Sequence, residues 1–269
     1  MTQSYKRLLQ IGNILFLIGT IMLNGLSNGA IREGVTIGSL SDKYFTLFAP
    51  AGITFSIWGV IYLMLIAFMV YQASGLFSGK NPDTPWLNKI GIWFMASGVF
   101  NSLWLVAWLY ERLGVALVLM LGLLASLLVI YFSLQIGLKS VDPKVRYLVH
   151  LPFSIYLGWI TVATVANVSS LLVSVGWEPP FASAEQWTNI MVIIAAVLGV
   201  LVTAARNDIA YGAVVMWALL GIIIKHNQLG PEGLPSVQLA AEIGIGLVLI
   251  TAILNVIRQR KRGSGLGYI

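Results

Sequence analysis

The sequence contains no cysteine, and charged residues make up only 10% of its 269 positions. Without cysteine the chain has no disulfide, no thiolate metal site and no cysteine nucleophile. His150 and His226 are its two histidines, and it has neither an HExxH motif nor clustered Asp and Glu, so we predict no metal site. An ordinary soluble domain carries about 25% charged residues. This chain has too few polar side chains to cover a globule in water, so we expect its surface to face lipid.

Apolar residues are abundant and are grouped in long segments. They make up 58% of the chain, and the mean hydropathy is +0.87. A segment of about 17 to 25 apolar residues can cross the bilayer as a helix, because the helix satisfies its own backbone hydrogen bonds. The sequence therefore predicts an all-α fold, a polytopic transmembrane helix bundle of about eight helices. The expected spans are residues 9–26, 49–71, 90–109, 113–137, 147–174, 188–205, 209–226 and 237–257.

The distribution of basic residues gives the orientation of these helices, because short cytoplasmic loops are enriched in Lys and Arg. With both termini placed in the cytoplasm, only Arg32, Lys43, Arg112 and Lys225 of the 16 Lys and Arg fall on the opposite side. We therefore predict an integral membrane protein, located in the cell membrane (the inner membrane of a bacterium), with both termini cytoplasmic. The net charge of +6 is then a feature of topology. The expected partner is the lipid bilayer, not a nucleic acid.

Nine tryptophans are present, and tryptophan commonly forms belts at the level of the lipid head groups. A belt explains the tryptophans that lie in loops or near the ends of the expected spans, which are Trp86, Trp93, Trp177 and Trp187. Trp58 and Trp159 lie near the middle of their spans, where an indole N–H finds no water. These two side chains are expected to face the interior of the bundle.

Helical spacing groups polar and aromatic side chains into three stripes, because residues three, four and seven apart share one face. The second span carries Trp58 and Tyr62, the third carries Asn101, Trp104 and Trp108, and the fifth carries Tyr156, Trp159, Ala163 and Asn167. Flat aromatic surface beside hydrogen-bonding groups suits a large, planar, mostly apolar ligand such as a tetrapyrrole or a sterol. The alternative is that these amides and indoles only join helices through hydrogen bonds.

Glu242 is the one acidic residue inside an expected span, about six residues from the outer end of the eighth helix. A carboxylate within the membrane is costly and often functional, for example in proton coupling. At this depth Glu242 can also reach the interface or bond to a neighbouring helix in its protonated form. Both roles, proton coupling and structural, are open at this point.

Taken in order, the three stripes resemble the TspO/MBR family, also called tryptophan-rich sensory proteins or the peripheral-type benzodiazepine receptor family. Residues 50–62 resemble the family's second helix, which has a proline at its start and a Trp followed four residues later by Tyr. Residues 100–104 are similar to its Asn-x-x-Trp helix, and residues 155–167 to its last helix. Three family positions differ, because Gly52 stands in place of a Trp, and Ser56 and Ile155 in place of prolines.

The resemblance covers residues 9–175, which are expected to form a five-helix TspO/MBR-like core. Residues 176–269 then add three further transmembrane helices and a basic cytoplasmic tail. The resemblance implies a ligand pocket between the helices, beneath the first loop, and a homodimer. Carried over position by position, the family's pocket residues correspond to Trp58, Asn101, Trp104, Tyr156, Trp159, Ala163 and Asn167.

Family members bind porphyrins, sterols and synthetic benzodiazepine-site ligands, so the resemblance implies a sensor or regulator that binds porphyrin, haem or a sterol-like molecule. Such a molecule would be a ligand, and no cofactor is predicted. In some bacterial members, the tryptophans that match Trp58 and Trp159 are linked to light-dependent oxidative breakdown of porphyrin. A porphyrin-degrading enzyme is therefore one alternative. A secondary transporter of a small molecule is another, because eight spans and Glu242 permit transport.

Overall fold

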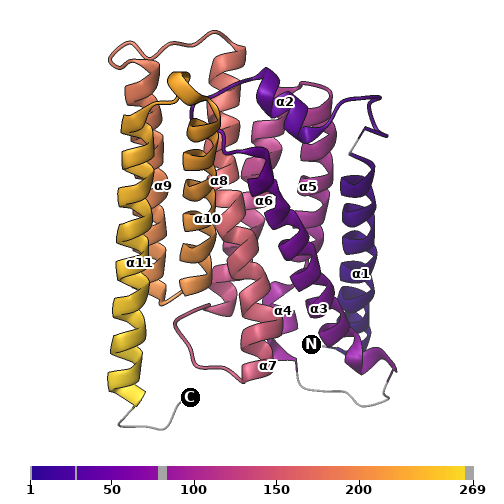
Figure 1. Ribbon diagram of the computed structural model, residues 1–269. Helices are drawn as coiled ribbons and strands as arrows, with labels where there is room; N and C mark the ends of the chain where they lie inside the picture. The colour runs from indigo at the N-terminus through magenta and orange to yellow at the C-terminus, as the bar shows by residue number, and fades with distance from the viewer. Residues whose placement is uncertain (1, 28, 78–83, 264–269) are drawn as a thin grey trace. The chain divides into compact units, whose positions relative to one another are not determined.

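The computed structural model describes residues 2–27, 29–77 and 84–263 (Figure 1). All regular secondary structure in these residues is helical, which confirms the predicted all-α class. Residues 264–269 of the expected basic tail lie outside the described residues.

Seven helices in the described residues are long and apolar enough to cross a membrane. They are α1 (Gln3–Leu26), α3 (Ile57–Phe77), α6 (Leu113–Leu134), α8 (Leu151–Ser174), α9 (Ala184–Arg206), α10 (Ile209–Gln228) and α11 (Pro235–Gly263). The span expected at residues 90–109 is the shorter apolar helix α5 (Trp93–Leu109), which has 17 residues. It begins late because Gly91, at φ 52°, ends the short helix α4 (Pro85–Ile90) and turns the chain.

Short helices form part of the connections. They are α2 (Ile37–Lys43), η1 (Gly52–Ser56), α7 (Pro143–Val145), η2 (Arg146–His150) and η3 (Gly230–Glu232). Helix α2 begins at a capping box, in which Thr36 and Ser39 each accept a hydrogen bond from the other's backbone N–H. Hydropathy does not predict α2, because this helix is only seven residues long.

The chain divides into two compact units. The first unit comprises Met1–Thr46, Ser56–Ile136 and Val141–Trp177, and the second comprises Leu47–Phe55, Gly137–Ser140 and Glu178–Ile269. The main division therefore falls near the expected boundary at residue 175, but two short segments from the expected core belong to the second unit.

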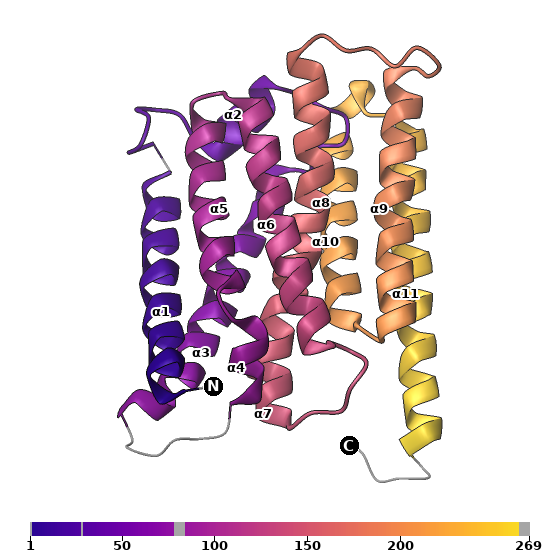
Figure 2. The ribbon, with the colours of Figure 1, turned by 180° about the vertical axis from the view of Figure 1, so that it is seen from behind.

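The long helices of the first unit lie side by side in both views (Figures 1 and 2), and the contacts of α1, α3, α5, α6 and α8 close a ring. Helix α1 contacts α3 and α5, α5 contacts α6, α6 contacts α8, and α8 contacts α3. Because every helix has two neighbours, each turns one face to the interior of the ring. This arrangement brings distant parts of the sequence together and positions the candidate site.

Aromatic rings pack together at one level of the first unit. The fully buried Phe68 makes edge contacts with Phe94, Phe153 and Trp86, at centroid distances of 5.7, 5.2 and 5.8 Å. Trp86 also stacks on Tyr71 and is only 6% exposed. The expectation that Trp86 belongs to a head-group belt is therefore wrong, because α4 turns this indole into the packed interior.

In the second unit, α9, α10 and α11 pack against one another. Small residues allow the close contact, since a Cβ on Gly199 would meet side-chain atoms of Val215 and Val248 at about 3 Å. The segment Leu47–Phe55 is held by α10. The Ala51 N–H donates to the Gly221 carbonyl at 2.9 Å, and the Trp217 indole donates to the Thr54 carbonyl at 3.0 Å.

Candidate functional site

Side chains from α3, α5 and α8 meet inside the first unit, and they include most of the residues predicted from the sequence. Trp58 and Tyr62 lie one turn apart at the start of α3. Asn101 and Trp104 lie in the middle of α5, and α8 contributes the predicted residues Tyr156, Trp159, Ala163 and Asn167. The three stripes therefore face one another across the ring.

Four rings, those of Trp58, Tyr62, Tyr156 and Trp159, form what we call the aromatic cluster. Trp58 stacks on Tyr62 with a centroid distance of 5.5 Å and an interplanar angle of 21°. Its other contacts are edge-on, with Tyr156 at 5.9 Å and Trp159 at 6.4 Å. Tyr156 and Trp159 are each 3% exposed, whereas Trp58 is half-buried. Trp58 is thus the ring of this cluster through which α3 and α8 touch.

Asn101 connects the aromatic cluster to α5 and α1. Its side chain is fully buried, and its amide donates to the Tyr156 hydroxyl at 2.7 Å. The Asn24 amide of α1 approaches the Asn101 oxygen at 3.5 Å. Asn101 therefore fixes the orientation of the Tyr156 ring. We did not predict a site role for Asn24, although its spacing of four residues from Thr20 puts both on one face of α1.

Trp104 and Asn167 form a separate pair. The Trp104 indole donates to the Asn167 side-chain oxygen at 2.9 Å, and the Asn167 amide donates to the Ala163 carbonyl at the same distance. Trp104 also stacks on Trp108 at 6.1 Å. These groups satisfy one another's hydrogen bonds, so this pair has the features of an interhelical connection.

A cavity of about 10 Å³ lies beside the aromatic cluster, which is enough volume for one water molecule. Its lining residues are Leu17, Thr20, Tyr62, Leu65, Phe94, Ser97, Gly98 and Tyr156. The Tyr62 hydroxyl is buried and makes no hydrogen bond of normal geometry to the described residues, although the Asn101 side chain lies close enough to interact with it. Thr20 and Ser97 were not predicted; Ser97 lies four residues before Asn101, so helical spacing could have placed it on the same stripe.

Comparison with known proteins identifies the family to which the chain belongs. A family model described as TSPO-like protein matches residues 10–254. The chain belongs to the TSPO-like family. The match includes α9, α10 and most of α11, so it extends well beyond the 9–175 region that carries the resemblance. No curated protein and no solved structure was found to match the chain.

In this TSPO-like protein, the first loop is attached to the turn between α5 and α6. Glu111 pairs with Arg32 at 2.9 Å and with Lys43, and it accepts a hydrogen bond from the Tyr44 hydroxyl at 2.6 Å. These hydrogen bonds, with Lys43 the largest contributor and then Tyr44 and Arg32, lower the pKa of the Glu111 carboxyl to about 2. Trp108 adds a contact, since its indole donates to the Ile37 carbonyl at 3.4 Å.

Glu242 lies on α11 in the second unit, and its side chain is exposed. It is not part of the aromatic cluster. In the part of the chain that the structure describes, no group of three or more His, Asp and Glu side chains is placed to hold a metal ion.

Proposed function

We propose that this integral membrane protein of the TSPO type binds a planar, mostly apolar molecule at the aromatic cluster and acts as a sensor or regulator for it. The ligand classes are tetrapyrroles, such as porphyrin or haem, and sterol-like molecules. The observation that carries the proposal is the meeting of the four rings beside a buried Tyr62 hydroxyl that makes no hydrogen bond of normal geometry to the described residues. Family membership supports the same site.

Binding requires the aromatic cluster to open. Ligand pockets measure about 300 to 1,000 Å³, whereas the cavity beside Tyr62 measures about 10 Å³. Trp58 makes three ring contacts in the cluster, and each such pair contributes about 0.5 to 1.5 kcal/mol. Opening therefore costs at most about 4.5 kcal/mol for these contacts. A net micromolar affinity corresponds to about 8 kcal/mol, so the ligand must gain up to about 12.5 kcal/mol in the opened site. A planar ligand recovers part of this by restoring the stacking.

The cavity favours an uncharged end of the ligand. All the residues that line it are uncharged, and Thr20, Tyr62, Ser97 and Tyr156 supply hydroxyl groups. A carboxylate placed among them would lose its hydration without gaining a cation, which is strongly unfavourable. A tetrapyrrole is therefore expected to enter with a ring edge that carries no carboxylate, and a sterol with its hydroxyl.

The test is titration of the detergent-purified chain with protoporphyrin IX, its dimethyl ester, haem and a fluorescent sterol, followed by tryptophan quenching in the dark. The wild-type protein should show saturable quenching, with the dimethyl ester at least as tight as the free acid. Tyr62→Phe should weaken binding by about tenfold, which corresponds to one hydrogen bond. Because the Tyr62 hydroxyl makes no hydrogen bond of normal geometry to the protein, this change should lower the free energy of unfolding by less than about 1 kcal/mol.

Tyr110→Phe is the matched control, since this tyrosine is 54% exposed. The absence of saturable quenching with all four ligands, or equal affinity in Tyr62→Phe and Tyr110→Phe, would refute the proposal.

The same samples are then illuminated. A light-dependent enzyme, with dissolved oxygen as the oxidant, is the second candidate, because the resemblance links the tryptophans that match Trp58 and Trp159 to porphyrin breakdown and these two rings are in edge contact. Loss of porphyrin absorbance that requires light and oxygen and disappears in Trp58→Phe would establish it.

A further inference from the structure

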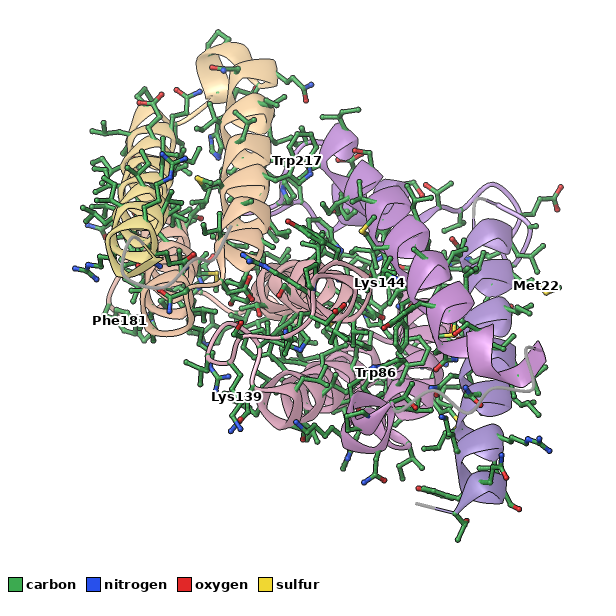
Figure 3. All side chains as sticks on the ribbon, turned by 90° about the horizontal axis from the view of Figure 1, so that it is seen from below. Met22, Trp86, Lys139, Lys144, Phe181 and Trp217 are labelled. Atoms are coloured by element: carbon green, nitrogen blue, oxygen red, sulfur yellow. The ribbon has the colours of Figure 1, made fainter. Side chains whose placement is uncertain are left out.

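Helix α1 has an unusual distribution of polarity for a helix in a membrane protein. Its exposed side is apolar and includes Leu15, Ile18 and Met22, which are 62%, 51% and 61% exposed. Figure 3 shows Met22 pointing away from the bundle. Its buried side carries polar residues along almost its whole length, namely Lys6, Gln10, Asn13, Thr20 and Ser27, with the half-buried Asn24 between the last two. This inward-facing set is called the polar stripe below.

The polar stripe is long enough to cross the bilayer. At 3.6 residues per turn, its members fall within a sector about 100° wide. From Lys6 to Ser27 the helix rises by about 32 Å, which equals the thickness of the hydrocarbon core. Polar groups inside a membrane protein are costly, and they often mark the route of a polar substrate or ion.

In one half of the stripe, Gln10 and Asn13 form a cluster of three buried amides with Gln72 of α3. Gln10 donates to the Gln72 carbonyl at 2.5 Å, and the Gln72 amide donates back to the Gln10 carbonyl at 3.2 Å. Asn13 donates to the Gln72 side-chain oxygen at 3.0 Å. Because Gln72 uses that oxygen as acceptor, Asn13 must present its amide there. Its own oxygen is then left buried without a partner among the described residues.

The other half of the stripe borders the cavity. Thr20 lines the cavity together with Ser97, Tyr62 and Tyr156. The Thr20 and Ser97 hydroxyls donate to backbone carbonyls at 2.8 and 2.7 Å, so their lone pairs are available as acceptors. The Tyr62 hydroxyl is available as a donor. One water molecule could bond to all three groups.

Interhelical hydrogen bonding explains part of this arrangement, since amides commonly join helices in membranes. That role alone favours polar groups that satisfy one another, as Trp104 and Asn167 do. The Asn13 oxygen has no partner among the described residues, and the Tyr62 hydroxyl makes no bond of normal geometry. An unpaired buried polar group costs about 1 to 3 kcal/mol. Buried polar groups of this kind are usually paired with water.

Between the two halves stands Leu17. This apolar residue lies on the same face of α1 as the stripe, between Asn13 and Thr20. It lines the cavity and is 5% exposed. These two polar residues are seven positions apart, so they are separated by about 10 Å along the helix. We propose that the inner face of α1 lines a narrow path for water, and with it for protons, which is closed at Leu17 in this conformation.

The chemistry of the path indicates that water and protons, and not metal ions or larger molecules, would pass along it. Apart from Lys6 at its end, the stripe consists of amides and hydroxyls, which exchange hydrogen bonds with water at little cost and offer no carboxylate for a metal ion. The cavity admits one water molecule and nothing larger. The path shares this cavity, including Thr20 and Tyr62, with the proposed ligand site. Its test is a proton flux measured without added ligand, so its outcome does not depend on whether a ligand binds at the aromatic cluster.

The test is proton flux into liposomes that contain the full chain, measured with an enclosed pH-sensitive dye under a potassium diffusion potential. Leu17→Ser should raise the flux by about tenfold, the equivalent of one added hydrogen bond at the closed point. Leu15→Ser is the matched control, because it makes the same chemical change two residues away on the exposed side of α1. It should leave the flux at the wild-type level.

A second variant tests the route. Adding Asn13→Leu to Leu17→Ser should return the flux towards the wild-type value, because it removes a polar group from the same path. If Leu17→Ser does not insert as a folded protein, Leu17→Ala replaces it, with an expected increase of several-fold. Equal proton flux in the Leu17 and Leu15 variants overturns the proposal. The proposal is also overturned if the flux rises in the Leu17 variant and Asn13→Leu does not lower it again, since the protons would then follow another route.

Discussion

The hydrogen bond between Trp104 and Asn167 provides the most direct test of how α5 and α8 are held together. Trp104→Phe removes the indole donor and leaves the Asn167 oxygen buried without its partner at 2.9 Å. A side-chain hydrogen bond between membrane helices contributes about 0.6 kcal/mol on average and about 1.7 at most. Loss of ring packing around a side chain that is 4% exposed adds about 1 kcal/mol. We expect Trp104→Phe to lower the free energy of unfolding by about 2 kcal/mol.

A double-mutant cycle separates the bond from the packing. Asn167→Leu removes the acceptor at similar volume, and the double variant removes both partners. If the bond is real, the double variant is less destabilised than the sum of the single variants by about 1 kcal/mol. Unfolding is followed by circular dichroism during titration of mixed micelles with SDS. A coupling within about 0.3 kcal/mol of zero would refute the reasoning, because independent sites add within that margin.

Two further predictions concern the loops. Because the pKa of Glu111 is lowered to about 2 from its ordinary 4.5, the attachment of the first loop is complete above pH 4.5 and is lost as the pH falls towards 2. Hydrogen exchange of the α2 amides, corrected for the intrinsic exchange rate, should become faster over this pH range in the wild type and not in Glu111→Gln. The same acceleration in both proteins would contradict the role of Glu111 in attaching the loop. Gly137 has φ 77°, and a Cβ there would lie 1.7 Å from the Arg206 carbonyl oxygen, so Gly137→Ala should lower the free energy of unfolding by about 3 kcal/mol or more. Gly19→Ala, where the added Cβ meets nothing within 4 Å, should be neutral or stabilising, and similar losses in both variants would contradict the close approach.

Much of the fold could be predicted from hydropathy alone. Long apolar segments can only be helices in lipid, because the backbone must satisfy its own hydrogen bonds there. The expected span at 209–226 corresponds to α10, and that at 113–137 to α6. The boundaries were less predictable, since a single glycine in an apolar stretch leaves the hydropathy unchanged. Gly91 at positive φ shortens α5 for this reason.

Helical spacing predicted which site residues share a face, but not what they touch. Trp58 and Tyr62 were placed on one stripe, and their stacking follows from that spacing. The separation of Trp104 and Asn167 into a pair of their own could not be predicted, because it depends on the distance between α5 and α8.

The sequence by itself determined the environment and the class of this protein. Its shortage of charge and its apolar segments demand lipid as solvent, and its order of Trp, Tyr and Asn residues identified the family, since composition and spacing are local properties. Only the tertiary structure decided that α1 turns its polar side inward, that Tyr62 lies beside a cavity with Thr20 and Ser97, and that Trp86 is buried. These features depend on which helices become neighbours in the ring, and contacts between residues far apart in the chain leave no periodic signal in the sequence.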